Sequence, residues 1–141
     1  MVLQEDAHTK LLEASLVKAG VETEPGLIVY RFCADLFYAN CNRFADDLRF
    51  LISTAPVPVR CVVVDASAIT DIDYSAACLL RMVLQELQAQ SVLVAFGRVN
   101  PFLRADMERH RITEVLGEGN IYAQLHTAVA AARSHAACDA A

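Results

Sequence analysis

Residues 62–76 read Val-Val-Val-Asp-Ala-Ser-Ala-Ile-Thr-Asp-Ile-Asp-Tyr-Ser-Ala, and this stretch says most about the architecture of the chain. A β-branched run ends in Asp65, a small polar turn follows, and an apolar helical pattern runs from Tyr74 to about Leu87. A continuous apolar run is typical of a strand that is buried on both faces, as in a parallel sheet. A helix start presents unpaired N–H groups and the positive end of the helix dipole, where α/β proteins bind phosphates. The stretch therefore predicts a strand, a loop and a helix whose start carries hydroxyls and carboxylates.

The rest of the chain repeats this alternation of buried strand and helix. Three apolar segments favour strands, and segments with apolar residues every three or four positions favour helices. The expected strands cover residues 27–33, 60–66 and 91–96, and the expected helices cover 41–53 behind Asn40, 74–89, a short segment from Pro101 behind Asn100, and 121–133. This alternation implies right-handed crossovers and a sheet covered by helices, the α/β class. Val63 and Leu80 are expected in the core between sheet and helix.

The two ends of the chain carry weaker patterns. Residues 5–19 have a weak helical pattern, and Gly20 is a suitable residue to end a helix there. We expect a loosely held linker helix in this segment. Residues 134–141 are expected to be a frayed tail.

Size and charge exclude several classes of function. The 141 residues fit a single domain, and the apolar content of 55% suits a sheet buried on both faces. The chain has 12 basic and 17 acidic residues, a net charge of −5, and no basic cluster, so nucleic acid is not an expected partner. No signal-peptide pattern is visible, and no run of about 18 apolar residues could span a membrane.

The sequence contains no metal or catalytic motif. None of the five cysteines forms a Cys-x-x-Cys pair, and the four histidines are scattered without ligand spacing. Unpaired buried cysteines fit a reducing compartment. There is no Gly-x-x-x-x-Gly-Lys loop and no pair of carboxylates with a nucleophile. No metal, no required cofactor and no enzymatic activity are expected.

Two motifs together resemble the STAS domains of SulP anion transporters, the sulfate-permease-like family. The first is Asp65-Ala66-Ser67 followed by Ile72-Asp73-Tyr74-Ser75-Ala76, where the family reads Asp-x-Ser and then Asp-Ser-Ser-Gly. The second is residues 25–32, Pro-Gly-Leu-Ile-Val-Tyr-Arg-Phe, followed by residues 36–40, Leu-Phe-Tyr-Ala-Asn. The second motif is typical of the SulP members, and the resemblance covers residues 25–133.

The resemblance implies an architecture and a role. STAS domains have a mixed, mainly parallel sheet with about four or five helices. Residues 1–24 would then be the linker from a preceding membrane region, residues 25–133 the STAS domain, and residues 134–141 a tail. The protein would lie on the cytoplasmic face of the plasma membrane as part of a transporter of the sulfate and bicarbonate class. Its role would be to regulate, assemble or stabilise that transporter, with the transporter's own membrane domain as partner and a homodimer also allowed.

The candidate binding residues lie where two strands end. In the expected topology the loop at Gly97 and Arg98 lies beside the loop that contains Ser67, Asp73 and Ser75. Two neighbouring helix starts with a guanidinium could hold a phosphate, and some STAS domains bind nucleotides, so a guanine or adenine nucleotide is the ligand that the resemblance allows. The alternative reading gives most of these residues local structural roles. Asp65 would accept hydrogen bonds from the turn at Ser67 and Ala68, and Asp73 or Ser75 would cap the helix.

The alternative function is a stand-alone anti-sigma-factor antagonist, which acts by partner switching. In those relatives the serine directly after the aspartate is phosphorylated, and here that position is Tyr74. Ser75 keeps a hydroxyl one residue later and is the candidate phosphoacceptor. Phe37 and Tyr38 are read either as packing residues at a strand edge or as contacts with the membrane part of a transporter.

Overall fold

The computed structural model describes residues 1–5 and 12–140 of the chain. Its elements follow one another in the order β1 (Val2–Glu5), β2 (Leu12–Ser15), β3 (Leu27–Arg31), α1 (Cys41–Thr54), β4 (Cys61–Asp65), α2 (Tyr74–Ala89), β5 (Leu93–Gly97), α3 (Pro101–Arg109), α4 (Ile112–Leu116), the 3₁₀ turn η1 (Glu118–Asn120) and α5 (Leu125–Ala140). Within these described ranges, no helix is long and apolar enough to cross a membrane.

One mixed sheet organises the molecule. The strand order is β2-β1-β3-β4-β5, in which β3, β4 and β5 are parallel to one another and β1 is antiparallel to both of its neighbours. The parallel strands read as continuous apolar runs because helices cover both faces of the sheet. The mixed, mainly parallel sheet with surrounding helices confirms the predicted fold class.

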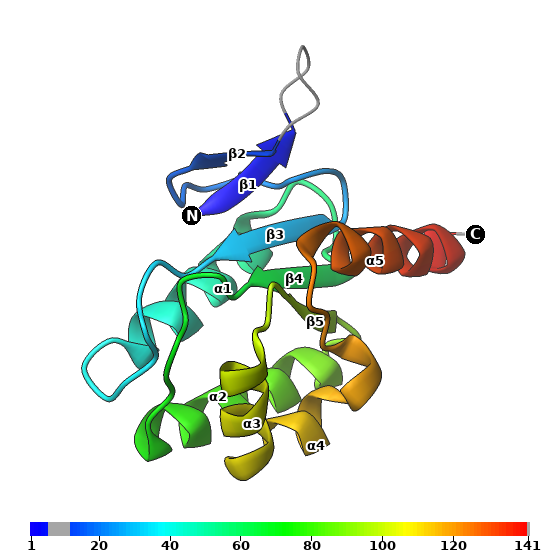
Figure 1. Cartoon of the computed structure of the whole chain (residues 1–141). Coiled ribbons are helices and arrows are strands. Elements are labelled where there is room, and N and C mark those ends of the chain that lie inside the picture. Colours follow the sequence, from blue (N-terminus) through cyan, green and yellow to red (C-terminus); the bar gives the residue numbers. More distant parts are fainter. Residues whose placement is uncertain (6–11, 141) are drawn as a thin grey trace.

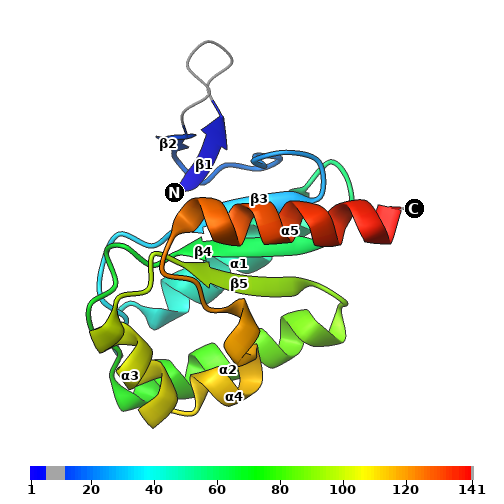
Figure 2. The same cartoon turned by 45° about the vertical axis from the view of Figure 1, so that its right-hand side comes forward.

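The two faces of the sheet have separate cores. Helices α1 to α4 pack on one face, and α5 packs alone on the other, as Figures 1 and 2 show from two directions. Val63 points to the α5 side and Leu80, from α2, packs on the opposite side, and both are buried as predicted. Alternate residues of each parallel strand therefore face different helices.

The helix predicted for residues 5–19 is wrong in its described part. Leu12–Ser15 is a strand that pairs with β1, and residues 6–11 lie outside the described residues. Val2 and Leu3 are buried on opposite faces of the sheet, so β1 contributes to both cores. Pairing between strands outweighs the weak helical pattern of this segment. Gly20 does adopt a positive φ of 78°, but in a turn and not at a helix end.

The C-terminal segment also departs from the prediction. Helix α5 begins at Leu125 and runs to Ala140, whereas a helix over 121–133 and a frayed tail were expected. Ile121 instead forms a bridge with Phe96 at the outer edge of β5, and the N–H of Tyr122 donates to the Phe96 carbonyl at 2.8 Å. The apolar Ile121 is thus used by the sheet edge before the last helix starts. The short helix α4 was not predicted.

Helix starts are where local sequence rules work best. Helix α2 begins at Tyr74, as predicted, and Asp73 Oδ1 accepts from the N–H of Ala76 at 2.8 Å. Asn100 caps α3 in the same way, through the N–H of Leu103, with Pro101 in the first turn. Asn40 stands at the start of α1 but its side chain does not cap that helix. It accepts from the N–H of Phe37 and donates to the Asp35 carbonyl, so it shapes the preceding loop.

Candidate functional site

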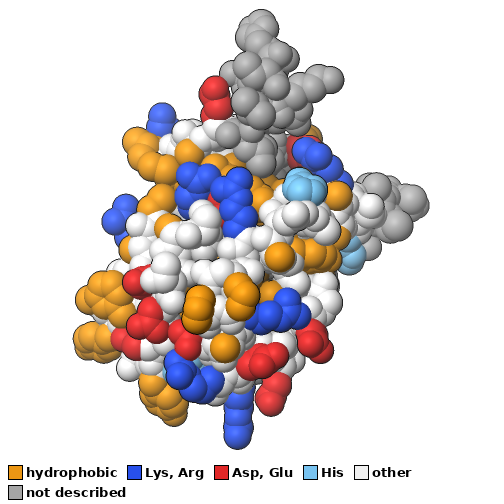
Figure 3. Space-filling model, in the orientation of Figure 1, with side chains coloured by type: hydrophobic (Ala, Val, Ile, Leu, Met, Phe, Trp, Pro, Cys, Tyr) orange, Lys and Arg blue, Asp and Glu red, His pale blue; other side chains and the backbone are white. Residues whose placement is uncertain are grey.

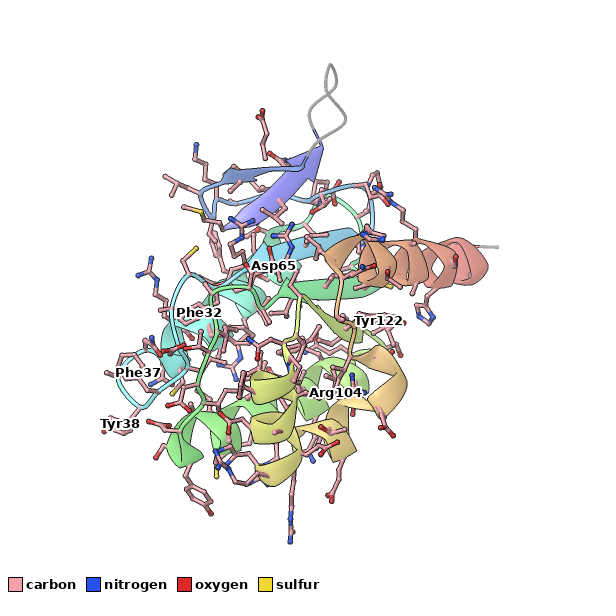
Figure 4. All side chains as sticks on the ribbon, in the orientation of Figure 1. Phe32, Phe37, Tyr38, Asp65, Arg104 and Tyr122 are labelled. Carbon is pink, nitrogen blue, oxygen red and sulfur yellow. The ribbon has the colours of Figure 1, made fainter. Side chains whose placement is uncertain are left out.

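The carboxyl ends of the three parallel strands bring a buried carboxylate and two arginines together. Arg31, Asp65 and Gly97 are the last residues of β3, β4 and β5, and they stand side by side in the strand register. In α/β sheets this edge is where ligands bind. Figure 4 shows Asp65 at this edge, on the side of the molecule that faces the viewer.

Asp65 is completely buried, and both oxygens of its carboxylate accept hydrogen bonds. Oδ2 accepts from Arg31 Nε at 3.0 Å and from Arg98 Nη1 at 3.2 Å. Oδ1 accepts from the N–H of Ser67 at 3.0 Å, which confirms the predicted turn for Ser67. A buried carboxylate requires such pairing because desolvation of an unpaired charge is very unfavourable. We call Arg31, Asp65 and Arg98 the arginine clamp.

Backbone geometry aims Arg98 at this carboxylate. Arg98 has a φ of 56°, in the left-handed region that non-glycine residues rarely occupy. Gly97, just before it, is buried, and a Cβ placed there would lie 3.0 Å from Leu125 Cδ1 and 3.1 Å from Leu125 Cα. Gly97 therefore lets α5 approach β5 closely. This packing accounts for a glycine at the position that was predicted to bind phosphate.

A second group of polar residues joins two loops. Asp35 Oδ1 accepts from the backbone N–H of Thr70 at 2.6 Å, from the Thr70 hydroxyl at 2.8 Å, and from the N–H of Asp71 at 3.1 Å. These hydrogen bonds lower the pKa of Asp35 below its ordinary value, with Thr70 as the main cause. Asp73 uses its second oxygen, Oδ2, to accept from the N–H of Tyr38 at 2.8 Å. The loop after β3 is thus fastened to the start of α2.

The fastened loops carry three exposed aromatic side chains. Phe37 is 44% exposed, Tyr38 is 76% exposed and Tyr74 is 72% exposed. We call these three residues the aromatic corner. Figure 4 shows Phe37 and Tyr38 projecting from the loop between β3 and α1. Figure 3 shows hydrophobic side chains at this margin beside several carboxylates, and a separate cluster of cationic side chains higher on the same face.

The predicted phosphate-binding residues therefore fall into two groups. Ser67, Gly97 and Arg98 surround Asp65 at the sheet edge. Asp73 and the exposed Ser75 lie at the start of α2, beside Tyr38. Among the described residues, no hydrogen bond or ion pair joins the two groups. The carboxylate of Asp73 is already used by the N–H groups of Ala76 and Tyr38, which is the capping role considered from sequence.

Sequence reasoning missed the clamp and the role of Asp35. A signal for the clamp was present, because Arg31 lies in the C-terminal half of the first predicted strand, residues 27–33, and Arg98 follows the last predicted strand. Strand ends of a parallel sheet meet at one edge, so both cations could have been placed beside Asp65. Asp35 gave no such signal, since its partners lie 35 and 36 residues away in the sequence.

An open hollow borders the clamp on the β3 side. Its volume is about 580 Å³, and it lies between the end of β3 and helix α1, where Arg31 and Arg43 contribute positive charge. The hydroxyl of Tyr30 in this hollow donates to Asp47 Oδ2 at 2.5 Å. Burial, together with this hydrogen bond to a carboxylate, raises the pKa of Tyr30 far above its ordinary value, so the phenol stays protonated.

Comparison with known proteins gives consistent results. The family model described as STAS domain matches residues 18–128. A probable sulfate transporter of Mycobacterium tuberculosis strain H37Rv is 31% identical over 109 residues, which is 77% of this chain and 20% of the relative; a protein with the same description from strain CDC 1551 matches equally. The chain thus spans about a fifth of the length of these curated relatives.

Solved structures share the fold at low sequence identity. A sulfate transporter family protein from Wolinella succinogenes matches with a TM-score of 0.67 and 17% identity, over 94% of this chain and 96% of that one. The STAS domain of a SulP transporter from Vibrio cholerae has the same TM-score and identity, over 80% of this chain and 85% of that one. The murine anion transporter Solute Carrier 26 family member A9 matches with a TM-score of 0.79 and 14% identity, over 94% of this chain and 22% of that one.

Proposed function

Because the chain belongs to the STAS domain family, we propose that it is the cytoplasmic domain of a SulP-type anion transporter and acts by docking onto the membrane-spanning part of that transporter. The relatives that are 31% identical are named as probable sulfate transporters, and they are about five times longer than the matched region. An anion of the sulfate or bicarbonate class is the proposed cargo. The domain would regulate, assemble or stabilise the transporter, and the transport step itself would take place elsewhere.

The observation that carries this proposal is the aromatic corner. Large exposed aromatic groups on a soluble surface mark interaction sites when they gather in one place. The loop that carries Tyr38 is joined to the start of the helix that carries Tyr74, because Asp73 accepts from the N–H of Tyr38 and directly precedes Tyr74. The hydrogen bonds of Asp35 and Asp73 hold both loops in place before any partner arrives. Aromatic anchors on a preorganised surface are typical of the residues that dominate binding energy at interfaces.

The charge around the corner indicates the kind of partner. Asp71 is exposed and Asp35 and Asp73 are partly exposed, so carboxylates border the aromatic side chains. A partner surface with apolar pockets and basic residues would complement this arrangement. The cytoplasmic loops of membrane proteins carry an excess of lysine and arginine. The cytoplasmic side of a membrane domain therefore fits the corner in both apolar character and charge.

The test combines gene context with transport. We expect the coding region around Met1 to encode a polypeptide with many apolar spans, and the membrane-spanning part, produced separately, should retain the domain during co-purification. Uptake of sulfate is then measured in cells that lack their own transporter, with the abundance of the membrane protein measured in parallel. The variants Tyr38→Ala and Tyr74→Ala should reduce uptake, or the retention of the domain, far more than they reduce the stability of the domain.

Phe102→Ala is the matched control for these variants. Phe102 is 82% exposed but lies on α3, outside the aromatic corner. Its removal should leave uptake and retention unchanged. Unchanged uptake and retention in the Tyr38 and Tyr74 variants would contradict docking through the corner. A fall in abundance alone would assign the corner to assembly, and not to regulation.

Ser75 distinguishes the alternative function. An anti-sigma-factor antagonist would be switched by phosphorylation at the start of α2, where Ser75 is exposed and Tyr74 occupies the usual phosphoacceptor position. Mass spectrometry of the chain isolated from its host would detect a phosphate on Ser75. Stoichiometric phosphate there, together with release of a bound partner protein, would favour the antagonist over the transporter domain. Size-exclusion chromatography tests the homodimer that the transporter reading allows.

A further inference from the structure

The arginine clamp carries more positive charge than its carboxylate can balance. Two guanidinium groups share the single oxygen Oδ2 of Asp65. Among the described residues, neither Arg31 nor Arg98 pairs with a second carboxylate. The cluster therefore has a net charge of +1, although the chain as a whole is acidic, with a net charge of −5.

The clamp also has hydrogen-bond donors to spare. A guanidinium has five N–H donors in a fixed planar fork. Arg31 uses its Nε and Arg98 uses one Nη to reach Asp65, and the described protein atoms leave the other donors of both groups to solvent. The side chains are 30% and 45% exposed, respectively, so these donors are accessible. The open hollow that Arg31 lines gives a small molecule a route to the donors of Arg31.

The positions of both cations are fixed in advance. Asp65 is fully buried, and its other oxygen accepts a hydrogen bond from the Ser67 N–H. Arg98 contacts Asp65 from a backbone with a positive φ of 56°, which is an unfavourable conformation for an arginine. Strain of this kind is found at ligand sites, where the arrangement of the side chain has a use. An ion pair needed only to neutralise Asp65 would be complete with Arg31 alone.

We propose that Arg31 and Arg98 form the binding site of a small oxyanion, with Asp65 as the buried residue that positions both guanidiniums. A tetrahedral oxyanion such as sulfate or phosphate presents several acceptor oxygens to the unused donors of the two forks. A small oxyanion would be the ligand that regulates the transporter through this domain, and this regulatory role rests on the proposed function. Binding itself does not depend on docking. The oxyanion has two sources, a free inorganic ion and the phosphate group of a nucleotide.

The first experiment is a titration of the 141-residue chain, followed by NMR through the arginine Nε–H and backbone amide resonances. Sodium sulfate is added at constant ionic strength, with sodium chloride as the balancing salt. We expect saturable shifts at the Nε–H groups of Arg31 and Arg98 and at the amides of Ser67 and Val99. Shifts that are absent, or that do not saturate and are the same in chloride alone, would overturn the proposal.

Further arms of the titration separate the two sources. Inorganic phosphate, AMP and GMP are compared with sulfate under the same conditions. Equal affinities for sulfate, phosphate and the nucleotides would identify a free oxyanion as the ligand. Affinity for one nucleotide about tenfold higher than for phosphate, with additional shifts beside the clamp, would identify a nucleotide phosphate. Either result supports the anion site.

Variants then test the assignment of residues. Arg98→Gln should weaken sulfate binding by about tenfold, because charge-assisted hydrogen bonds are lost. Arg98→Lys, which keeps the charge without the fork, should recover part of the affinity. Arg109→Gln removes the same charge at the far end of α3 and should leave the affinity within about twofold of the parent. A folded Arg98→Gln protein with parental affinity would overturn the proposal, and if this variant does not fold, the titration of the parent chain decides.

This outcome is separate from that of the docking proposal. Variants of the aromatic corner do not touch the clamp, so Tyr38→Ala should bind sulfate like the parent. Loss of docking with intact sulfate binding would leave the anion site in place. Intact docking without sulfate binding would overturn the anion site alone.

Discussion

Two roles can explain the glycine at position 97: binding of a phosphate, or close packing of α5 against β5. In the structure its missing side chain lets α5 lie against β5, where an added Cβ would be 3.0 Å from Leu125 Cδ1, 3.1 Å from Leu125 Cα and 3.4 Å from Ala128 Cβ. Contacts this short require a shift of α5 by a few tenths of an ångström. Overpacking of a close-packed core costs about 1–3 kcal/mol. The φ of Gly97 is not in the positive range, so alanine can adopt it. Alanine also lowers the conformational entropy of the unfolded chain, which stabilises the folded protein by about 0.4–1 kcal/mol. The cost of overpacking is larger than this stabilisation, so Gly97→Ala should lower the free energy of unfolding by about 1 kcal/mol.

The assay is urea unfolding followed by circular dichroism, with Gly119→Ala as the matched control. A Cβ at Gly119 has no atom within 4 Å, and its φ is likewise not positive, so this variant should be neutral or slightly stabilised. Adding Leu125→Ala to Gly97→Ala should give a smaller loss than the sum of the two single losses, because part of the clash is relieved. A Gly97→Ala protein as stable as the Gly119→Ala protein would refute the packing account and restore a binding role for the glycine.

Three further outcomes follow from the contacts described. Leu80→Ala in the core between α2 and the sheet should lower the free energy of unfolding by about 2–5 kcal/mol in the same assay. Asp73→Ala removes the cap of α2 and the anchor of Tyr38, so it should cost about 1–2 kcal/mol and broaden the amide resonances of the loop at Tyr38. The pKa of Asp35 is lowered from its ordinary value of 3.8 in the folded chain, so its contribution to stability is present above that pH and is lost as the pH falls through the folded value. Hydrogen exchange at Thr70 and Asp71 should therefore accelerate on acidification relative to other loop amides, and Asp35→Asn should abolish this difference.

Most of the parallel half of the fold could be predicted from the sequence. The segments at Leu27–Arg31, Cys61–Asp65 and Tyr74–Ala89 carry strong periodic patterns, and their burial follows those patterns. The hairpin of β1 and β2 could not be predicted, because a short strand next to a weak amphipathic pattern gains its hydrogen bonds only from partners distant in the sequence. The start of α5 was misplaced for the same reason, since Ile121 is recruited by the edge of β5.

Only the local contacts of the candidate site could be predicted from the sequence. Capping by Asp73 and the turn at Asp65 need only local geometry, and both are present. The pairing of Asp65 with Arg31 and Arg98 spans 34 and 33 residues, respectively, so no local rule contains it. The strand order shows which residues meet at the sheet edge and so predicts this pairing. The sequence predicted the fold class but not the strand order.

The unequal covering of the sheet has a consequence for synthesis of the chain. One face of β3 and β4 is closed by α5 alone, through Leu125, Ala128, Val129 and Ala132. Chains emerge from the ribosome with the N-terminal part first, at about 5–20 residues per second. The apolar residues Leu27, Val29 and Val63 on that face are therefore exposed to the cell until residues 125–132 have been made. During this interval the nascent sheet has an uncovered hydrophobic face, which is the kind of surface that chaperones would bind. The face is covered once α5 has emerged from the ribosome and packs on it.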